Sequence, residues 1–466
     1  MKSKEMMLEW LDANQSDFTE MADRIWEKPE IALKEHFASK LQADYLAGKG
    51  FKITWKVGGM PTAFIAEWGE GKPILGFLGE YDALGNLSQK RQPDPEPETP
   101  GGPGQACGHN LLGTGVLAAA VATQAWLVEN KLPGTIRYYG CPAEEILAGK
   151  VYMARDGVFD DLDAALNYHP GSINHPSKGS MVALNNMKFR FHGRSAHAGG
   201  SPHLGRSALD AVELMNVGAN YMREHVESNV RIHYVITNGG DAPNIVPPEA
   251  EVWYYVRAPQ RATVEAVTER LRKIAQGAAM MTETTMEELF ITGCYNVLNN
   301  HYLADLQYEN MKLIGPIHFT DEEMAFAERV NSNYPPEIRG KKMDLGKEYE
   351  NLPLIGDNFP SKDEGVFMTG SSDVGDVSWI TPLAMLWTAA SAVYATGHSW
   401  GITACSGTSI GHKGMLHAAK TLALTAADLV TNPEHLQKAR AEFDEKTRDN
   451  PYKTPLPDWA KLPLDE

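Results

Sequence analysis

Apolar and polar residues alternate in blocks along this chain, and the blocks differ in their spacing. The region before residue 85 holds two strand-like runs, FKITWKV and TAFIAEWG, and then a continuous apolar run, KPILGFLG, that leads to Glu80 and Asp82. Continuous apolar runs of this kind are typical of strands buried on both faces of a sheet. An alanine-rich segment that begins near Leu111 has the composition of a buried helix. Strands and helices in this arrangement predict an α/β fold.

The loop before that helix, QACGHNLLGTG, carries a thiol and an imidazole two positions apart. Cys107 and His109 flank a glycine on irregular backbone, and the following helix fixes the loop. Both side chains can therefore point at one cation. A buried structural cysteine is the ordinary alternative for such a pair.

Three other strand-like runs deliver residues that can bind metal ions. GTIRYYGCPAEE ends at Glu144 and Glu145, DAALNYHP contains His169, and LAMLWTAASAVYATGHSWG contains His398. In open α/β sheets, ligands bind in the crevice outside the carboxyl ends of the strands, so these chain positions describe one pocket. Together with the Cys-Gly-His loop, the pocket has enough ligands for two metal ions.

A second α/β block lies between these motifs. It reads NNMKFRFHG, ALDAVELMNVGANYMREHV, VRIHYVITNG, AEVWYYVRAP, TVEAVTERLRKIAQGAAMM and TTMEELFITG, in the order strand, helix, strand, strand, helix, strand. This β-α-β-β-α-β order describes a complete small sandwich. Because His398 comes only afterwards, we expect 185–299 to be inserted into a catalytic, metal-binding domain formed by 1–184 and 300–466. Within the latter part, 335–365 has the composition of a long surface loop.

Composition and charge narrow the classes of function. Lys and Arg number 43 against 60 Asp and Glu, the formal net charge is −17, and no basic stripe or base-stacking motif is present. These features argue against a nucleic acid partner, because binding to nucleic acid depends on neutralising phosphates. The N-terminus lacks the apolar core of a signal peptide, and no uninterrupted run reaches the roughly 18 apolar residues of a membrane span. With only four cysteines, the chain is expected to be cytoplasmic, with no membrane partner.

Short motifs recur in this chain in the order found in one known family. They are ACGHN, GCPAEE, NYHP, the SAHAG loop, GGDAPNIVP, SSDVGDVSW and GHSWG. In this order they resemble the dinuclear metallopeptidase superfamily of aminoacylases and carboxypeptidases, and within it the hippuricase-like and indoleacetyl-amino-acid-hydrolase-like amidohydrolases, especially the aminobenzoyl-glutamate hydrolase branch. The resemblance continues through SPHLGRSALDAV, AAMMTETT and HKGMLHAAKT, so it covers most of the chain. It implies a catalytic domain with a central mixed sheet flanked by helices, an inserted α+β lid and dimerisation domain, and a homodimer.

Carried over position by position, the resemblance implies two divalent metal ions, with manganese and zinc as the expected metals. The implied metal ligands are Cys107, His109, Glu145, His169 and His398. Many members continue the first motif with Asp and then His, whereas this chain has Asn110 and Leu112. Further ligands from that loop are therefore not expected.

The implied activity is hydrolysis of the amide bond of an N-acyl or N-aroyl amino acid, with p-aminobenzoyl-glutamate or a related compound as substrate. Two divalent ions would polarise the scissile carbonyl and activate a water molecule. Glu144, the implied catalytic carboxylate, would take the proton and deliver it to the leaving amine. Because adjacent residues of a strand point to opposite faces, a turn after Pro142 is needed to bring both Glu144 and Glu145 to the metals.

Four more residues are candidates for roles around the metals. Asp82 can accept the second imidazole proton of a ligating histidine, or it can simply cap its loop. By resemblance, His197 reaches the site of the partner copy and hydrogen-bonds the developing oxyanion. Asn244 offers amide donors to a substrate carbonyl or carboxylate, with turn formation as the alternative. Arg257 can bind a carboxylate or form a structural ion pair.

Other functions stay open from the sequence. A dipeptidase or an aminoacylase of the same superfamily would use the same residues. A cysteine hydrolase would use Cys107 with a histidine base and would need no metal. A non-catalytic binding protein would hold a structural metal, but closed structural sites generally use four Cys or His ligands, whereas glutamate ligands with a spare carboxylate favour open coordination.

Overall fold

The chain folds into two compact units, each assembled from separate stretches of sequence. The computed structural model describes residues 3–339 and 344–464. Unit 1 is formed by the chain up to Gly179 together with Leu298–Val366 and Val377–Tyr452. Unit 2 is formed by Ser180–Val297, Phe367–Asp376 and the chain from Lys453 onward. The predicted roles of the two parts, catalytic domain and inserted lid, stay predictions.

A seven-stranded mixed sheet forms the core of unit 1. In spatial order its strands are β1 (Lys52–Trp55), β2 (Phe64–Glu70), β4 (Gly134–Cys141), β3 (Ile74–Glu80), β5 (Ala164–Gly171), β13 (Leu383–Ala389) and β6 (His175–Pro176). The four central strands, β4, β3, β5 and β13, pair in parallel, and the outer pairs are antiparallel. Parallel strands end at the same edge, so the segments that follow them meet there. The predicted α/β fold with a central mixed sheet is confirmed.

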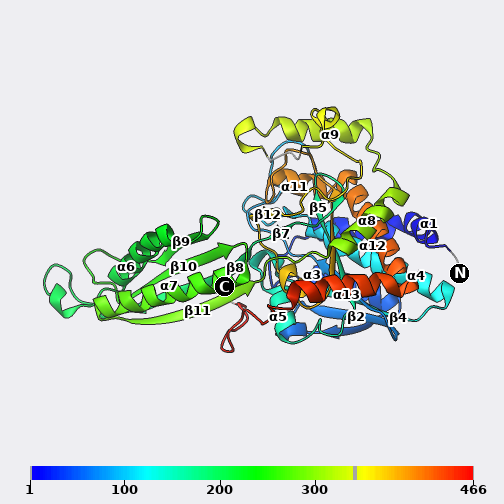
Figure 1. The fold of residues 1–466 in the computed structure, drawn as a ribbon. Helices are drawn as coiled ribbons and strands as arrows, with labels where there is room; N and C mark the ends of the chain where they lie inside the picture. Colours follow the sequence, from blue (N-terminus) through cyan, green and yellow to red (C-terminus); the bar gives the residue numbers. More distant parts are fainter. Residues whose placement is uncertain (1–2, 340–343, 465–466) are drawn as a thin grey trace. The chain divides into compact units, whose positions relative to one another are not determined.

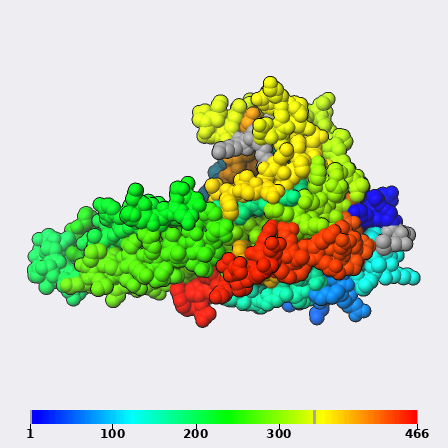
Figure 2. All heavy atoms as spheres, viewed as in Figure 1, coloured from blue at the N-terminus to red at the C-terminus, as the bar shows by residue number. Residues whose placement is uncertain are grey.

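The helices of unit 1 pack around this sheet and against one another (Figure 1). They are α1 (Met6–Ala13), α2 (Gln15–Glu27), α3 (His36–Gly48), α4 (His109–Asn130), α5 (Gly149–Arg155), α8 (His301–Ile314), α9 (Asp321–Ser332), α11 (Trp400–Ser406), α12 (Ser409–Thr431) and α13 (Pro433–Thr447), while the short α10 (Val374–Ser378) links the units in sequence. α4 contacts β3, β4 and β5, and α12 contacts α4, β5 and β13. These two long helices therefore cover one face of the sheet. α13 lies on the surface of unit 1, where Figure 2 shows it in orange-red.

α4 is apolar on all sides because it is enclosed by the sheet and by other helices. By length and hydropathy it could cross a membrane, contrary to the expectation from the sequence, but 89% of its most apolar window is buried inside the structure. A helix that is hydrophobic all round belongs in a core. At Gly113 an added Cβ would lie 2.2 Å from the carbonyl oxygen of Glu80. This close contact fixes the start of α4 beside the end of β3.

Unit 2 has the predicted order of strand, helix, strand, strand, helix, strand. Its elements are β8 (Ala183–His192), α6 (Ala208–Met222), β9 (Arg231–Asn238), β10 (Glu249–Ala258), α7 (Arg261–Thr282) and β11 (Thr285–Cys294), with a small parallel pair of β7 (Ser180–Met181) and β12 (Phe367–Met368). The strands form an antiparallel sheet in the order β11, β8, β10, β9. α6 and α7 contact each other, β8 and β10, so they cover the same face. β9 is left at one edge.

The segment 335–365 differs from the surface loop that the sequence predicts. Residues 340–343 lie outside the described part of the chain. Beyond them, Leu354, Ile355 and Phe359 are buried in small apolar clusters. The prediction is wrong for this second part, because its apolar side chains are scattered among polar ones and show no periodicity in the sequence.

The burial of α4 predicts where unit 1 is sensitive to substitution. Leu117→Ala should lower the free energy of unfolding by about 2–5 kcal/mol, because Leu117 is fully buried in the main core and its truncation leaves a cavity. Val128→Ala on the same helix is the control, since Val128 is 57% exposed, and it should change stability by less than about 0.5 kcal/mol. Urea unfolding of the purified protein measures both. Equal effects of the two substitutions would contradict the assignment of α4 as the core helix.

Candidate metal centre

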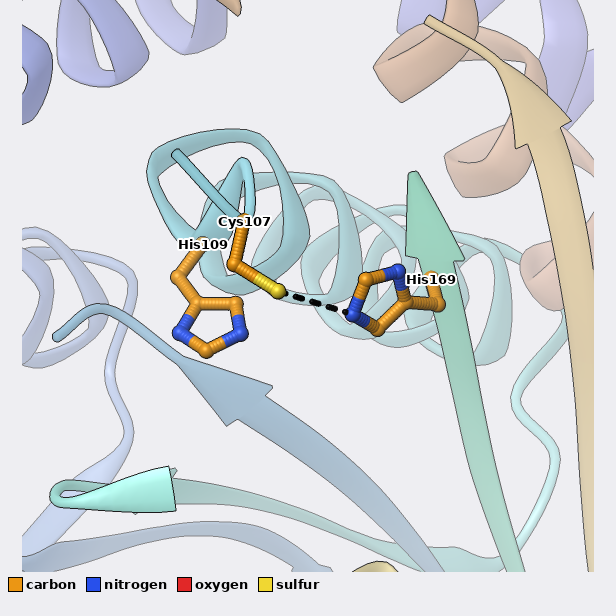
Figure 3. A group of neighbouring side chains, drawn as sticks. All are labelled: Cys107, His109 and His169. Carbon is orange, nitrogen blue, oxygen red and sulfur yellow. Dashed lines mark hydrogen bonds between the residues drawn. The ribbon is translucent and has the colours of Figure 1, made fainter. Parts of the chain in front are cut away.

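The five predicted metal ligands come together at the carboxyl edge of the unit 1 sheet. Cys107 and His109 lie at the start of α4, Glu145 in the turn after β4, His169 in β5, and His398 in the loop after β13. Their donor atoms form two groups, each within 4.8 Å, that share Cys107: one adds His109 and His169, and the other adds Glu145 and His398. Figure 3 shows the first group, with the Cys107 thiol directed toward the His169 ring. The set has the size of a centre for more than one ion.

The glycine between Cys107 and His109 is required by the local backbone. Gly108 has a φ of 75°, a left-handed conformation that costs a glycine little. A Cβ at this position would also come within 3.2 Å of the Pro170 side chain. The loop can therefore turn tightly against the end of β5, which brings the thiol and both imidazoles into one cluster.

The imidazoles of His109, which is buried, and His169, which is half-buried, present the same ring nitrogen to the cluster. His169 Nδ1 lies 2.8 Å from the carbonyl oxygen of Pro170, and its Nε2 lies 3.3 Å from the Cys107 sulfur. His109 Nδ1 lies 2.9 Å from Asp82 Oδ1. An acceptor at Nδ1 holds the proton on that nitrogen and leaves the Nε2 lone pair for a metal. Asp82 thus has the position expected of a carboxylate that orients a ligating histidine, although this role stays a prediction.

A turn after β4 directs the two adjacent glutamates. Ala143 has a φ of 58°, and Glu144–Ile146 forms a single turn of 3-10 helix. The backbone N–H of Ala143 donates to Glu35 Oε1 at 2.9 Å, and the N–H of Glu145 donates to Asp82 Oδ2, also at 2.9 Å. A non-glycine residue in the left-handed region is uncommon, and these hydrogen bonds hold it there.

Burial controls the protonation of the cluster. It raises the pKa of Glu145 to about 7 and lowers the pKa of His169 to about 4. Burial also raises the pKa of the Cys107 thiol well above its usual range, and the nearby Glu145 adds to this shift. Burial therefore disfavours the charged form of each group: the Cys107 thiol keeps its proton unless a cation displaces it, His169 is neutral with a free lone pair, and Glu145 titrates near neutral pH.

Two buried atoms test whether the residues fit a metal. His109 Nε2 and Glu145 Oε1 have no hydrogen-bond partner among the described residues. Buried polar atoms are ordinarily paired, so each lacks a partner that an ion could supply. Glu145 Oε2 lies 3.3 Å from Nε2 of His398, whose side chain is 56% exposed. Thiolate, imidazole and carboxylate donors together suit a transition-metal ion, and the exposed histidine leaves a route to solvent.

Three buried side chains beside the cluster did not emerge from the sequence as site residues. Glu35 accepts hydrogen bonds from Ala143 N and Thr62 Oγ1, and burial, with Asp82 nearby, raises the pKa of Glu35 to about 8. Lys150 forms an ion pair with Glu80, and Glu80 also lies next to His109. Only Glu80 carried a signal in the sequence, because it lies at the end of an apolar strand.

The remaining predicted residues belong to unit 2. His197 is exposed, and its Nδ1 accepts hydrogen bonds from Gly199 N at 3.2 Å and Gly200 N at 2.9 Å. The ring proton must then be on Nε2, which makes that nitrogen a donor. Asn244 is also exposed, and Arg257 Nη1 donates to a backbone carbonyl oxygen at 3.3 Å. The structure does not bring these three residues into the groups around Cys107.

Comparisons with known proteins agree with this site. Residues 183–280 match the family described as peptidase dimerisation domain. Over 461 residues, 96% of each chain, the protein is 41% identical to one of the subunits of p-aminobenzoyl-glutamate hydrolase from Escherichia coli. The chain belongs to the M20 peptidase family. It is a hydrolase that acts on amide bonds, and the predicted family and reaction class are confirmed.

Other similar proteins agree with this result. Xaa-Arg dipeptidase of Mus musculus is 29% identical over 90% of this chain and 87% of its own length. A solved aminobenzoyl-glutamate utilization protein from Klebsiella pneumoniae has a TM-score of 0.60 at 18% identity, covering 89% of this chain and 97% of that one. A dinuclear metal-binding peptidase of the M20 family from Bacillus subtilis has a TM-score of 0.56 at 17% identity, covering 90% and 99%. At these identities the solved structures show the common fold.

Asp82 contacts two elements of the site, which leads to a prediction about metal affinity. Asp82→Asn should weaken metal binding by about 10- to 100-fold, because the amide cannot hold the His109 proton as a carboxylate does. Asp44→Asn is the control, since Asp44 forms an exposed ion pair with Lys40. Competition with a chromophoric chelator measures both dissociation constants. An unchanged constant for Asp82→Asn would mean that Asp82 only caps its loop.

Proposed function

We propose that this enzyme uses two divalent metal ions to hydrolyse N-acyl or N-aroyl amino acids, with p-aminobenzoyl-glutamate or a related compound as its substrate. The observation that carries the proposal is the convergence of the five donor residues around Cys107. The 41% identity to the p-aminobenzoyl-glutamate hydrolase of Escherichia coli supports the substrate class. Manganese and zinc are the proposed metals, since the donors combine a thiol with imidazoles and carboxylates, and a cytoplasmic location is proposed with them.

The residues around the metals divide the work of hydrolysis. When bound, the ions polarise the scissile carbonyl and lower the pKa of a water molecule toward about 7. Glu144 takes the proton from the attacking water and delivers it to the amide nitrogen, which leaves poorly as an anion. In support, Glu144 Oε2 lies 3.9 Å from His109 Nε2, and the residue is 8% exposed. Asp82 holds the His109 ring and the backbone of Glu145 in place during turnover.

A cysteine hydrolase is the weaker alternative. A nucleophilic cysteine needs a lowered pKa, which positive neighbours or a helix N-terminus usually provide. Burial instead raises the pKa of Cys107. A thiol of this kind becomes a thiolate when a metal displaces its proton, so its surroundings favour a metal ligand over a nucleophile.

We infer that the enzyme works as a homodimer in which unit 2 joins the copies. The match of 183–280 to a peptidase dimerisation domain supports this assembly. β9 lies at the sheet edge and exposes Val235 and Ile236, and α6 exposes Tyr221. Unpaired edges and exposed apolar side chains are characteristic of surfaces that are covered in an assembly. In the dimer, His197 donates a hydrogen bond to the oxyanion in the partner's site, while Asn244 and Arg257 bind the substrate carboxylate.

A hydrolysis screen tests the function directly. The protein is stripped of metal, reloaded with manganese, zinc, cobalt or nickel, and given p-aminobenzoyl-glutamate, other N-aroyl and N-acyl amino acids, and dipeptides that end in arginine. We expect release of the amino acid from the aroyl compounds, and loss of activity with chelator. Faster cleavage of the dipeptides would instead indicate a dipeptidase, like the relative from Mus musculus.

Glu144 and Glu145 are adjacent, but their substitution should affect different properties, turnover for Glu144 and metal content for Glu145. Glu144→Gln should keep both metal ions but lower turnover by about 10²–10⁴-fold, because it removes the proton carrier alone. Glu145→Gln should lower metal content, since it weakens a ligand. Elemental analysis together with turnover separates the two effects. If Glu144→Gln retains parental turnover, another group carries the proton.

Mixing two inactive variants tests whether His197 acts in the partner's site. In a mixed dimer of Glu144→Ala and His197→Ala chains, one site collects both defects and the other has neither. With random exchange, half of the dimers are mixed, so about a quarter of all sites should be active. Each variant alone, taken through the same dissociation and reassociation, is the control. Without recovery after verified exchange, His197 serves its own chain or no site.

A further inference from the structure

An ion pair without access to solvent lies next to the proposed metal ligands. Lys150, in the first turn of α5, is 0% exposed, and Glu80, the last residue of β3, is 2% exposed. The Lys150 ammonium lies 2.5 Å from Glu80 Oε1. Lysine is almost never fully buried unless it is paired. Burying two charges is costly, and a well-packed apolar pair is often as stable, so this pair calls for an explanation beyond stability.

The second oxygen of Glu80 faces the proposed metal centre. Glu80 Oε2 lies 3.3 Å from His109 Nε2, the fully buried nitrogen that has no hydrogen-bond partner among the described residues. Since Asp82 contacts Nδ1 of this ring, Nε2 is the nitrogen that would bind a metal. The donor atoms of Glu80, His109 and Glu144 also lie within 4.8 Å of one another.

We propose that Glu80 is an additional metal ligand on the His109 side of the centre and that Lys150 is its positioning residue. Lys150 binds one carboxylate oxygen, which leaves the other directed toward the ion that His109 binds. The inference rests on the proposed metal-dependent function and deepens it, because it adds an oxygen ligand that the sequence motifs do not include.

The charges of the site support this assignment. Glu80, Asp82, Glu144 and Glu145, together with a Cys107 thiolate, carry five negative charges when all are ionised. Two divalent ions and the Lys150 ammonium balance them. Without Lys150, the site would carry an excess negative charge in a low-dielectric interior, where unpaired charge is strongly unfavourable. The carboxylate of Glu80 would add a hard oxygen donor beside His109, which makes Mn²⁺ a suitable probe.

Three variants separate a metal ligand from a purely structural ion pair. They are Glu80→Gln, Lys150→Met and the double variant, and Lys4→Met is the matched control because Lys4 pairs with Asp428 at 2.7 Å and contacts no proposed ligand. Each apoprotein is titrated with Mn²⁺ alone, and free Mn²⁺ is counted by electron paramagnetic resonance. Thermal unfolding of each apoprotein is recorded in parallel, so that loss of folding is distinguished from loss of binding.

The parent and Lys4→Met should bind two Mn²⁺ per chain. Glu80→Gln should bind one of them at least about tenfold more weakly and should lower the apoprotein melting temperature, because it removes a charged partner of the buried Lys150 ammonium. Lys150→Met should also weaken that ion. The double variant should regain melting temperature but not Mn²⁺ affinity.

Recovery of both properties in the double variant, or parental affinity in Glu80→Gln, would overturn the assignment and leave Glu80 as a structural partner of Lys150. Absence of Mn²⁺ binding by the parent, with no binding of zinc in competition with a chromophoric chelator, would instead contradict the proposed metal-dependent function. The two failures are therefore distinguishable, and neither depends on finding the substrate.

Discussion

Repulsion among buried acidic groups is the constraint on which the proposed site depends. Glu80, Asp82 and Glu144 are all less than 9% exposed, and Glu145 lies beside them. Desolvation by burial, together with the nearby charges of Asp82 and Glu80, raises the pKa of Glu145 to about 7. Cations bound at the site neutralise this negative charge. The fold supplies one of them, Lys150, and the unpartnered donor atoms indicate where others would bind.

The fold keeps this unfavourable cluster in place by making its surroundings rigid. Four parallel strands end at one edge, α4 packs tightly against β3 at Gly113, and Glu35 and Asp82 hold the turn after β4. Ala143 and His398 both have positive φ values. Unusual backbone conformations of this kind persist where the surrounding structure determines them, and they gather at functional sites. The packing of the core thus holds the site residues in backbone conformations that they would not adopt on their own.

Much of the fold could be predicted from the sequence because its strong signals are local. The continuous apolar run before Glu80 and the β-α-β-β-α-β order of the inserted block both correspond to observed elements. The convergence of the candidate ligands could be predicted because parallel strands bring their carboxyl ends together. Their roles stay predictions, as do those of His197, Asn244 and Arg257, which the structure describes only within unit 2.

The parts that could not be predicted depend on contacts between distant segments. Lys150 has the sequence appearance of an ordinary solvated helix lysine, and nothing near it indicates that Glu80 is its partner. Glu35 likewise resembles a surface acid before a helix, yet it is fully buried and contacts the turn at Ala143. Tertiary packing determines such pairs of residues, and neither the periodicity of apolar residues nor the spacing of motifs predicts them.

X-ray absorption at the zinc edge of the zinc-loaded protein tests the central claim, that Cys107 and the strand-end residues form one metal centre. The account predicts a sulfur neighbour at about 2.3 Å together with nitrogen and oxygen neighbours at about 2.0–2.2 Å. It also predicts that the sulfur signal disappears in Cys107→Ala, since among the described residues Cys107 is the cysteine that belongs to the groups of candidate ligands. A spectrum with only nitrogen and oxygen neighbours, or a sulfur signal unchanged in Cys107→Ala, would contradict it.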